Sequence, residues 1–419
     1  MRFRLLHHLR RRWKRVMIIA ALIGPGIITS NVDNDAGGIT TYSMAGAHFG
    51  YSLLWSLIPI SLALYLIQEM SSRMGVVTGK GLSDLIRERF GIKATFYLLT
   101  AIFFTNLGNV ISEFAGIAAS MELFGVRRGL SVPVAMVLVW LLVVKGTYKT
   151  TEKIFLAAST IYFLYILSGV LAHPDWSQVF HALRHPTFSF GPGETAMLVA
   201  LTGTTIAPWM QFYLQSSIVE KHTKWRDYKY TRLDVFTGSV IVNVVAFFIV
   251  VVCGATLFKG GIRVDSAEAA ARALEPLAGP YCSILFALGL LNASLFSASI
   301  LPLSTAYTIC EGMGWEDGVN KKFSEAPQFY GLYSILLLFG GGVILLPGVP
   351  LIPIMYLSQV INGVVLPAVL VFMLILINNP KVMGEHRNSM IENILVGATI
   401  AVVSFLSISL IYMTLRGQS

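Results

Sequence analysis

The chain has 419 residues and a formal net charge of +9; hydrophobic residues make up 55% of it and charged residues only 13%. This composition, with a mean hydropathy of +0.69, excludes an ordinary soluble domain. The sequence has no Gly-rich phosphate loop and no nucleophile elbow, so an enzyme is not indicated. We predict one all-α integral membrane domain over residues 1–419.

Roughly 20 apolar residues cross a bilayer as a helix, and the chain has about eleven such stretches. We predict them at residues 16–47 (broken), 51–68, 96–124, 132–144 (short), 154–172, 196–219 (broken), 235–257, 281–310, 330–346, 352–377 and 391–415. Residues 1–15 form a basic segment before the first span. We expect a first repeat over residues 16–172, a second over residues 194–378, and an additional last helix at residues 391–415.

Lys and Arg residues are concentrated before the first predicted span and after the second, fourth and sixth spans. These residues are Arg2, Arg4, Arg10, Arg11, Arg12, Lys14, Arg15, Arg73, Lys80, Arg87, Arg89, Lys93, Lys145, Lys149, Lys153, Lys221, Lys224, Arg226, Lys229 and Arg232. Positive charge in every second connection predicts a cytoplasmic N-terminus and, with an odd number of spans, a C-terminus outside. Arg127 and Arg128 are the main exception. Membrane topology thus explains the charge, and we expect no nucleic acid partner.

An acidic residue interrupts the first span. Asp35 lies in the middle of what would otherwise be one apolar helix. A carboxylate at membrane depth costs at least ~3 kcal/mol, so it usually faces a partner or a water-filled path. We therefore expect an ion site at Asp35. A helix-capping role at the start of the second half-helix fits the same position and can coexist with ion binding.

The sixth span is interrupted as well. Gly203, Thr204 and Pro208 lie in the middle of its apolar run. Pro208 has no amide hydrogen, so backbone carbonyls near Gly203 and Thr204 lose their helical partners and need a cation or water. Spans one and six are five helices apart. This is the separation expected if spans one to five and spans six to ten form an inverted repeat. In such transporters, paired broken helices mark the substrate site.

Different short motifs are distributed along nearly the whole chain, at residues 24–26, 45–51, 77–82, 113–114, 311–312, 357–360 and 383–384. In order and spacing they resemble the natural-resistance-associated macrophage protein family of proton-coupled importers of divalent transition metals. The resemblance implies a LeuT/APC-type fold with a 5+5 inverted repeat and broken helices 1 and 6. It also implies a multi-pass protein of the cell membrane, which we expect to be a bacterial inner membrane. The resemblance further implies that the monomer is functional in the lipid bilayer.

Two motifs differ from the family's pattern. The family has Asp-Pro-Gly-Asn in span one, where this chain has residues Asp35 to Gly38, and Met-Pro-His in span six, where it has residues Ala207 to Trp209. The resemblance thus implies a harder and roomier site that has lost an amide, a thioether and an imidazole. Oxygen-only surroundings suit magnesium, calcium and manganese, and magnesium keeps several waters. The pattern looks like the family's magnesium-transporting branch.

By position, the resemblance implies that Asp35 is the principal ligand, bound to the ion directly or through its waters. The backbone carbonyls of Val32 and Thr204 are expected as further contacts. Gly38 and Ala207 occupy the positions of the two lost side-chain ligands. Gln359 matches an amide of span ten, which either binds the ion or its water or packs helices together.

Two further residues lie beside these positions. Asp33 is additional to the family's pattern; it either adds charge to the ion path or is a solvated residue of the break. Trp209 cannot be a metal ligand, because an indole has a donor but no lone-pair acceptor, so we expect it to wall the cavity. Met210 is expected to pack in the core.

The family's proton route is largely replaced. The family has two acidic residues three positions apart in span three; here Glu113 remains, but the position three before it is Val110, next to Asn109. The two histidine positions of span six hold Trp209 and a residue of Leu214-Gln215. Neutral groups cannot relay protons, so we expect no proton coupling. Glu113 is either protonated and structural or part of the path.

The sequence predicts an importer of Mg²⁺ and Mn²⁺, as partly hydrated ions, that works by alternating access. The divalent metal ion is the substrate, and no resident cofactor is expected. A proton-coupled Mn²⁺/Fe²⁺ importer with an altered site is the first alternative. An amino-acid transporter of the same fold is the second, although Asp35 would repel a substrate carboxylate. A channel would need a repeated ring of polar groups, which the sequence does not display.

Overall fold

Apolar stretches of the sequence form long helices in the computed structural model, which describes residues 25–145, 160 and 163–417. Seven segments of this part are long and apolar enough to cross a membrane. They contain the helices α4 (Leu57–Thr78), α5 (Leu82–Leu123), α12 (Tyr228–Cys253), α15 (Cys282–Met313), α16 (Pro327–Ile344), α17 (Leu351–Ile377) and α19 (Met390–Leu415). Each of these helices overlaps one predicted span.

The remaining predicted spans are shorter or broken. Span one is the pair α2 (Pro25–Asp33) and α3 (Ala36–Phe49), and span six is the pair α10 (Pro192–Thr205) and α11 (Pro208–Glu220). The short fourth span is α6 (Arg128–Val144), and α8 (Phe163–Leu171) is the described part of the fifth. The basic N-terminal run, Lys149 and Lys153 lie outside the described residues.

Short helices connect these spans. They are η1 (Leu54–Ser56), α9 (Trp176–Arg184), η3 (Trp225–Asp227), η4 (Gly254–Phe258), α13 (Ala267–Ala271), η5 (Arg272–Leu274), α14 (Glu275–Ala278), η6 (Gly279–Tyr281) and α18 (Pro380–Met383). The described part of the chain contains no strand. The prediction of an all-α membrane bundle is therefore confirmed.

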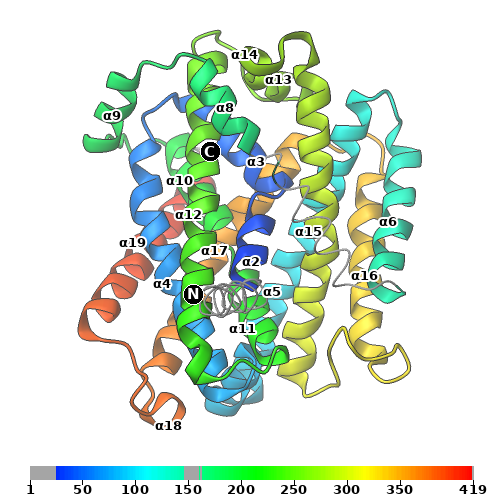
Figure 1. Cartoon of the computed structure of the whole chain (residues 1–419), viewed down its shortest axis with the longest axis vertical. Helices are drawn as coiled ribbons and strands as arrows, with labels where there is room; N and C mark the ends of the chain where they lie inside the picture. The colour runs from blue at the N-terminus through cyan, green and yellow to red at the C-terminus, as the bar shows by residue number, and fades with distance from the viewer. Residues whose placement is uncertain (1–24, 146–159, 161–162, 418–419) are drawn as a thin grey trace, which may run out of the picture.

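The first broken helix runs through the middle of the bundle, where α2 and α3 pack against α12 (Figure 1). The N–H of Gly26 donates to Asp234 Oδ2 at 2.7 Å. A Cβ atom on Gly26 would lie only 2.8 Å from that oxygen and from the backbone nitrogen of Val235. Glycine at position 26 thus lets α2 lie directly against α12.

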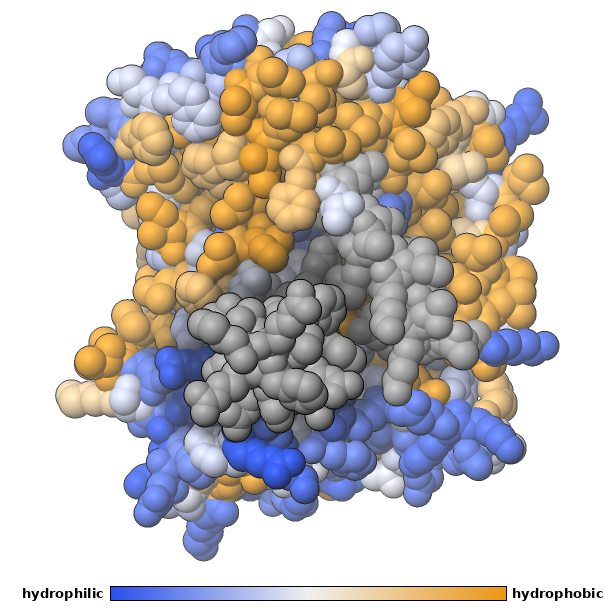
Figure 2. Space-filling view, in the orientation of Figure 1, coloured by the Kyte–Doolittle hydropathy of each residue, from blue (hydrophilic) through white to orange (hydrophobic). Residues whose placement is uncertain are grey.

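The outer surface is apolar around the middle of the molecule. Figure 2 shows hydrophobic residues in a broad band, with hydrophilic residues gathered at the two ends. Large apolar side chains such as Phe104, Phe236 and Ile408 are more than half exposed on this surface. An apolar belt between polar ends fits a molecule surrounded by lipid.

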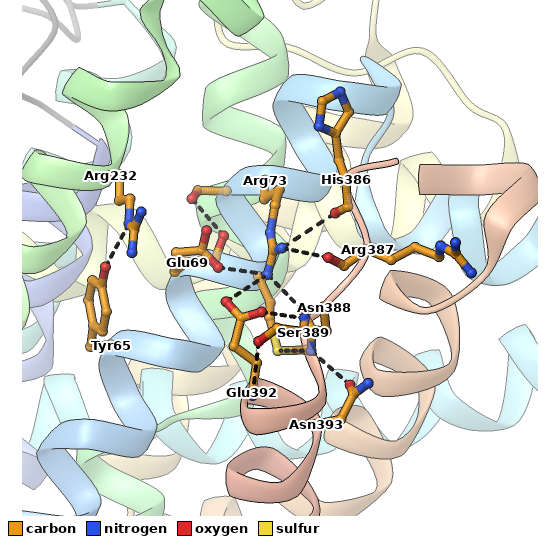
Figure 3. Close-up of polar contacts among 12 residues, drawn as sticks. Tyr65, Glu69, Arg73, Arg232, His386, Arg387, Asn388, Ser389, Glu392 and Asn393 are labelled. Atoms are coloured by element: carbon orange, nitrogen blue, oxygen red, sulfur yellow. Dashed lines mark hydrogen bonds and ion pairs between the residues drawn. The ribbon is translucent and has the colours of Figure 1, made fainter. Parts of the chain in front are cut away.

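A buried ionic cluster joins three segments of the chain (Figure 3). We call it the Arg73 cluster; it consists of Glu69 and Arg73 of α4, Tyr228 of α12, and Asn388 and Glu392 at the start of α19. Arg73 donates to Glu69 Oε2 at 2.9 Å and to Asn388 Oδ1 at 2.6 Å, and Glu392 lies 3.6 Å away. The Tyr228 hydroxyl donates to Glu69. The connections after the second and sixth spans thus lie at the same end, as the charge pattern requires.

Candidate metal site

The break in the first span lies at Asp35. α2 ends at Asp33 and α3 begins at Ala36, while Asp35 itself has an extended backbone (φ −72°, ψ −175°). Its Oδ1 atom accepts a hydrogen bond of 2.6 Å from the N–H of Gly38, which satisfies a free amide of the first helical turn. The capping role is therefore present, and it holds a carboxylate that is only 5% exposed at the break.

A second carboxyl group meets the same helix end. The N–H of Ala36 donates to Glu113 Oε2 of α5 at 3.3 Å, while Glu113 Oε1 has no hydrogen-bond partner. Glu113 is fully buried, and its side chain contacts that of Asp35. The acid that is retained in the third span thus lies at the candidate site itself.

The break in the sixth span lies between Thr205 and Pro208. The two residues between them, Ile206 (φ −124°, ψ 57°) and Ala207 (φ −63°, ψ 138°), leave the helical conformation. Because Pro208 has no N–H, the carbonyl of Thr204 lacks the donor that a continuous helix would provide. The predicted break is present, and its fixed φ makes Pro208 a suitable first residue for α11.

The two breaks face each other. A Cβ atom on Gly38 would lie 3.3 Å from Asp35 Oδ1 and 3.3 Å from Thr204 Oγ1, so both oxygens flank Gly38. The hydroxyl groups of Tyr42 and Thr205 share a hydrogen bond of 2.8 Å, which ties α3 to α10. The side-chain hydroxyl of Thr204 was not predicted as a site group, because only its carbonyl matched the family's pattern.

Gly38 lies directly against the end of α2. The same Cβ atom would lie 2.4 Å from the carbonyl oxygen of Asp33, a distance too short for any side chain. The carbonyl of Asp33 therefore leaves no space for a Cβ atom at this position. The expectation of a roomier site stays a prediction. Ala207, the other position of a lost ligand, is 2% exposed.

Gln359 lies beside the start of α3. A Cβ atom on Gly37 would lie 1.8 Å from Gln359 Nε2. Gln359 Oε1 accepts from Asn362 Nδ2 at 2.8 Å, and Asn362 exchanges two hydrogen bonds of 3.0 Å with Asn109. Asn109, predicted in the path, is thus linked to the site through Asn362 and Gln359. Asn362 was missed, although an amide one turn after Gln359 in an apolar span was a usable signal.

Val32 and Trp209 make protein contacts. The carbonyl of Val32 accepts a hydrogen bond of 3.4 Å from Ser297 Oγ of α15. Trp209 is 1% exposed, and its ring centre lies 6.2 Å from that of Tyr213. Both residues are buried, and their roles as carbonyl ligand and cavity wall stay predictions.

The positions of the replaced proton route hold groups with structural contacts. A Cβ atom on Gly340 of α16 would lie 2.5 Å from Val110 Cγ1, so Val110 packs against that helix. Gln215 Nε2 donates to the carbonyl of Lys80 at 2.8 Å. Glu113 is therefore the one titratable side chain among the positions considered for this route.

The carboxyl groups of Asp35 and Glu113 and the hydroxyl of Thr204 bring oxygen donors to the two breaks. The Gln359 amide presents its nitrogen toward Gly37, and its oxygen accepts from Asn362. Within the described residues, no group of three or more His, Cys, Asp or Glu side chains could hold a metal ion alone. A cation here would need backbone oxygens, amides or its own waters to complete its coordination shell. Such a set of donors suits a hard divalent cation.

Comparison with known proteins identifies relatives over nearly the whole chain. Residues 26–413 match the family model described as "Natural resistance-associated macrophage protein-like". The divalent metal cation transporter MntH of Caldanaerobacter subterraneus subsp. tengcongensis is 26% identical over 409 residues, which cover 94% of this chain and 94% of that protein.

Solved structures share the fold. A crystal structure of the Eremococcus coleocola manganese transporter superposes with a TM-score of 0.78 at 21% identity, covering 94% of this chain and 86% of the other. A crystal structure of MhsT in complex with L-phenylalanine gives a TM-score of 0.60 at 15% identity, covering 93% and 97%. These likenesses confirm the predicted LeuT-type fold and, at such identities, concern the fold alone.

Proposed function

The chain belongs to the natural resistance-associated macrophage protein-like family, and on that premise we propose that it imports Mg²⁺ and Mn²⁺ as partly hydrated ions by alternating access, without proton coupling. It is a transporter and not an enzyme. The names of its relatives, divalent metal cation transporters, support the broad function. The observation that carries the choice of ion is that the two side-chain atoms flanking Gly38 are oxygens, from Asp35 and Thr204.

The donor set favours hard cations. Asp35 and Thr204 place two oxygens on either side of Gly38, and Ala207 stands where the family has a thioether. Magnesium releases its waters reluctantly and is usually held by one or two carboxylates with waters retained. Asp35, aided by Glu113 and by the Gln359 amide, would bind the ion or its waters, with the Val32 and Thr204 carbonyls as further contacts.

The groups that replace the family's proton route support the proposed absence of proton coupling. Val110 and Gln215 cannot carry a proton, and Glu113 alone offers no relay through the described residues. The driving force would be the ion gradient and the membrane potential. A potential of 100 mV is worth ~4.6 kcal/mol for a doubly charged ion, at about 2.3 kcal/mol per charge.

The charge pattern supports a cytoplasmic N-terminus and a C-terminus outside. The end of the bundle that carries the Arg73 cluster and α18 would then face the cytoplasm (Figure 1). The proposed location is a bacterial inner membrane, with a single chain as the working unit and no nucleic acid or resident cofactor.

One observation favours the first alternative, a proton-coupled importer of Mn²⁺ or Fe²⁺. The thioether of Met355, one turn before Gln359 on α17, accepts a hydrogen bond of 3.6 Å from Thr40 of α3. A soft donor is thus available near the break, from a helix other than the one expected. An amino-acid substrate is disfavoured, because the carboxylate of Asp35 would repel that of the substrate.

The test is ion influx into proteoliposomes that hold the purified protein. Mg²⁺ and Mn²⁺ are supplied outside under an inside-negative potential, and interior pH is recorded at the same time. Asp35→Asn is the key variant, because asparagine also caps helices and so removes the charge while keeping the cap. Glu268→Gln, an exposed acid of α13, is the matched control.

We expect Mg²⁺ and Mn²⁺ entry without interior acidification, lost in Asp35→Asn and kept in Glu268→Gln. Mn²⁺ entry with acidification and without Mg²⁺ entry would overturn the proposal in favour of the proton-coupled alternative. Uptake of a radiolabelled amino acid without metal entry would favour the amino-acid transporter.

A further inference from the structure

Asp33 is an unusual buried acid. It is 2% exposed, and both of its carboxylate oxygens are buried without a hydrogen-bond partner. Other buried acids of the described chain have partners: Asp234 accepts from the N–H of Gly26, and Glu194 accepts from the N–H of Ser189, each at 2.7 Å. Within the described residues, Asp33 is the only buried acid with both carboxylate oxygens unpartnered.

The place of Asp33 in the fold makes this charge more unfavourable. Asp33 is the last residue of α2, and the free carbonyls at the C-terminal end of a helix carry partial negative charge. Asp35 lies two residues further on, and Glu113 contacts Asp35. None of the ion pairs of the described residues includes Asp33. Several sources of negative potential therefore meet at one buried break.

A buried carboxylate without a partner is expensive, and it either becomes neutral or attracts a cation. The break already has the features of a cation site, because Asp35 and Thr204 flank Gly38 and the Asp33 carbonyl lies against the same residue. Asn34 Oδ1, between the two acids, is also buried without a partner. The unpartnered oxygens thus extend from Asp33 to the site around Asp35.

We propose that Asp33 is a second cation-binding carboxylate, which holds the transported divalent cation, directly or through its waters, together with Asp35. This inference rests on the proposed function and adds a residue to its site. With Glu113 protonated, the carboxylates of Asp33 and Asp35 match the charge of a doubly charged ion, whereas a monovalent ion would leave one charge unbalanced. Asp33 would therefore set both the affinity for divalent cations and their preference over monovalent ones.

The experiment measures binding to the purified full chain in detergent by isothermal titration calorimetry with MnCl₂ and MgCl₂. Asp33→Asn removes the charge at nearly constant volume, and Asp33→Glu keeps the charge. Glu194→Gln is the matched control, because it neutralises another buried acid that has its own protein donors. Thermal unfolding and size-exclusion chromatography show whether each variant is folded.

We expect Asp33→Asn to weaken Mn²⁺ and Mg²⁺ binding at least ten-fold, Asp33→Glu to restore part of that loss, and Glu194→Gln to bind like the wild type. The ion-induced rise in unfolding temperature should shrink in parallel. Binding by a folded Asp33→Asn protein within two-fold of the wild type would overturn the inference. A wild type that binds and transports neither ion would instead refute the proposed function, so the two failures are distinguishable.

If Asp33→Asn does not fold, Asp33→Ser is the second variant, since serine is small and carries no charge. Its expected loss of affinity is the same. Wild-type affinity in that variant would count against Asp33 in the same way.

Discussion

Gln359 owes its orientation to Asn362. The amide oxygen of Gln359 accepts from Asn362, and Asn362 is itself held by two hydrogen bonds to Asn109 of α5. All three side chains are at most 1% exposed, and a buried polar group that loses its partner costs ~1–3 kcal/mol. The three amides therefore act as one unit that fixes the Gln359 side chain beside Gly37.

Replacing Asn362 by leucine should disturb the site without touching a proposed ligand. Asn362→Leu leaves the amide oxygen of Gln359 and the side chain of Asn109 without their partner, so we expect Mn²⁺ affinity to fall about ten-fold, or ~1.4 kcal/mol, measured by calorimetry. Asn106→Leu is the control. Asn106 lies one turn before Asn109 on α5 and donates to Thr305 Oγ1 at 2.9 Å. It should lower stability by a similar amount and leave affinity unchanged. Equal affinities in the two variants would contradict this account.

The crossing of α10 and α17 depends on two glycines. A Cβ atom on Gly203 would lie 2.2 Å from the carbonyl oxygen of Gln359 and 2.2 Å from the nitrogen of Gly363. A Cβ atom on Gly363 would lie 2.2 Å from the carbonyl of Val199. These are backbone atoms that cannot move aside like a side chain, so the contact fixes Thr204 and Gln359 relative to each other.

Gly203→Ala should therefore separate the two helices. We expect a loss of ~1–3 kcal/mol, the usual cost of overpacking, together with weaker Mn²⁺ binding, since the separation moves Gln359. Thermal unfolding and calorimetry measure the two effects. Gly108→Ala on α5 is the control, because its Cβ would meet nothing within 4 Å; alanine there should be neutral or stabilising. A stable Gly203→Ala protein would show that the crossing adapts.

The Arg73 cluster connects helices that lie far apart in the sequence (Figure 3). Arg73 also donates to the carbonyls of His386 and Arg387, which attaches the segment before α19 to α4. The side chains of Arg73 and Glu69 are 9% and 7% exposed. Because both side chains are buried, removal of one partner leaves the other charge uncompensated. The free-energy cost of that charge is larger than the stabilisation that the intact pair provides.

Arg73→Ala should accordingly destabilise the protein by ~3–5 kcal/mol, seen as a lower unfolding temperature in detergent. Combining it with Glu69→Gln should recover a large part of that loss, because the carboxylate that remains, Glu392, is 28% exposed. The exposed pair of Lys80 and Glu88, 46% and 50% exposed, provides the comparison: Lys80→Ala should cost less than ~1 kcal/mol. A double variant as unstable as Arg73→Ala would mean that the backbone contacts of Arg73 dominate.

Across the whole molecule, features with a local cause were predictable from the sequence. Asp35 and Pro208 each break a helix for a reason carried by the residue itself, and the apolar runs predicted the spans. The pairing of Asn109 with Asn362 was not predictable, because those residues are 253 positions apart. The approach of the Asp33 carbonyl to Gly38 also escaped prediction, since it depends on the angle between α2 and α3, which the sequence pattern does not specify.

The proposed transport without proton coupling has a consequence for the whole molecule. If only the ion moves, accumulation should follow the membrane potential alone, and 100 mV is worth ~4.6 kcal/mol for a divalent ion. In proteoliposomes with a potassium-diffusion potential, we expect the initial rate of Mn²⁺ entry to rise with inside-negative potential and to be insensitive to a pH gradient. Entry that follows the pH gradient at zero potential would show proton coupling. Asp35→Asn vesicles measure the background leak.

The Arg73 cluster also bears on how the protein is made. Asn388 is translated 315 residues after Arg73; at ~5–20 residues per second, this delay is about 15–60 s. During that interval the Arg73 side chain is already present in α4, and Glu69, four residues earlier on the same helix, is the partner available to it. The pair with Glu69 thus leaves Arg73 with a partner until residues 386–392 are made, and the cluster can be completed only late in biogenesis.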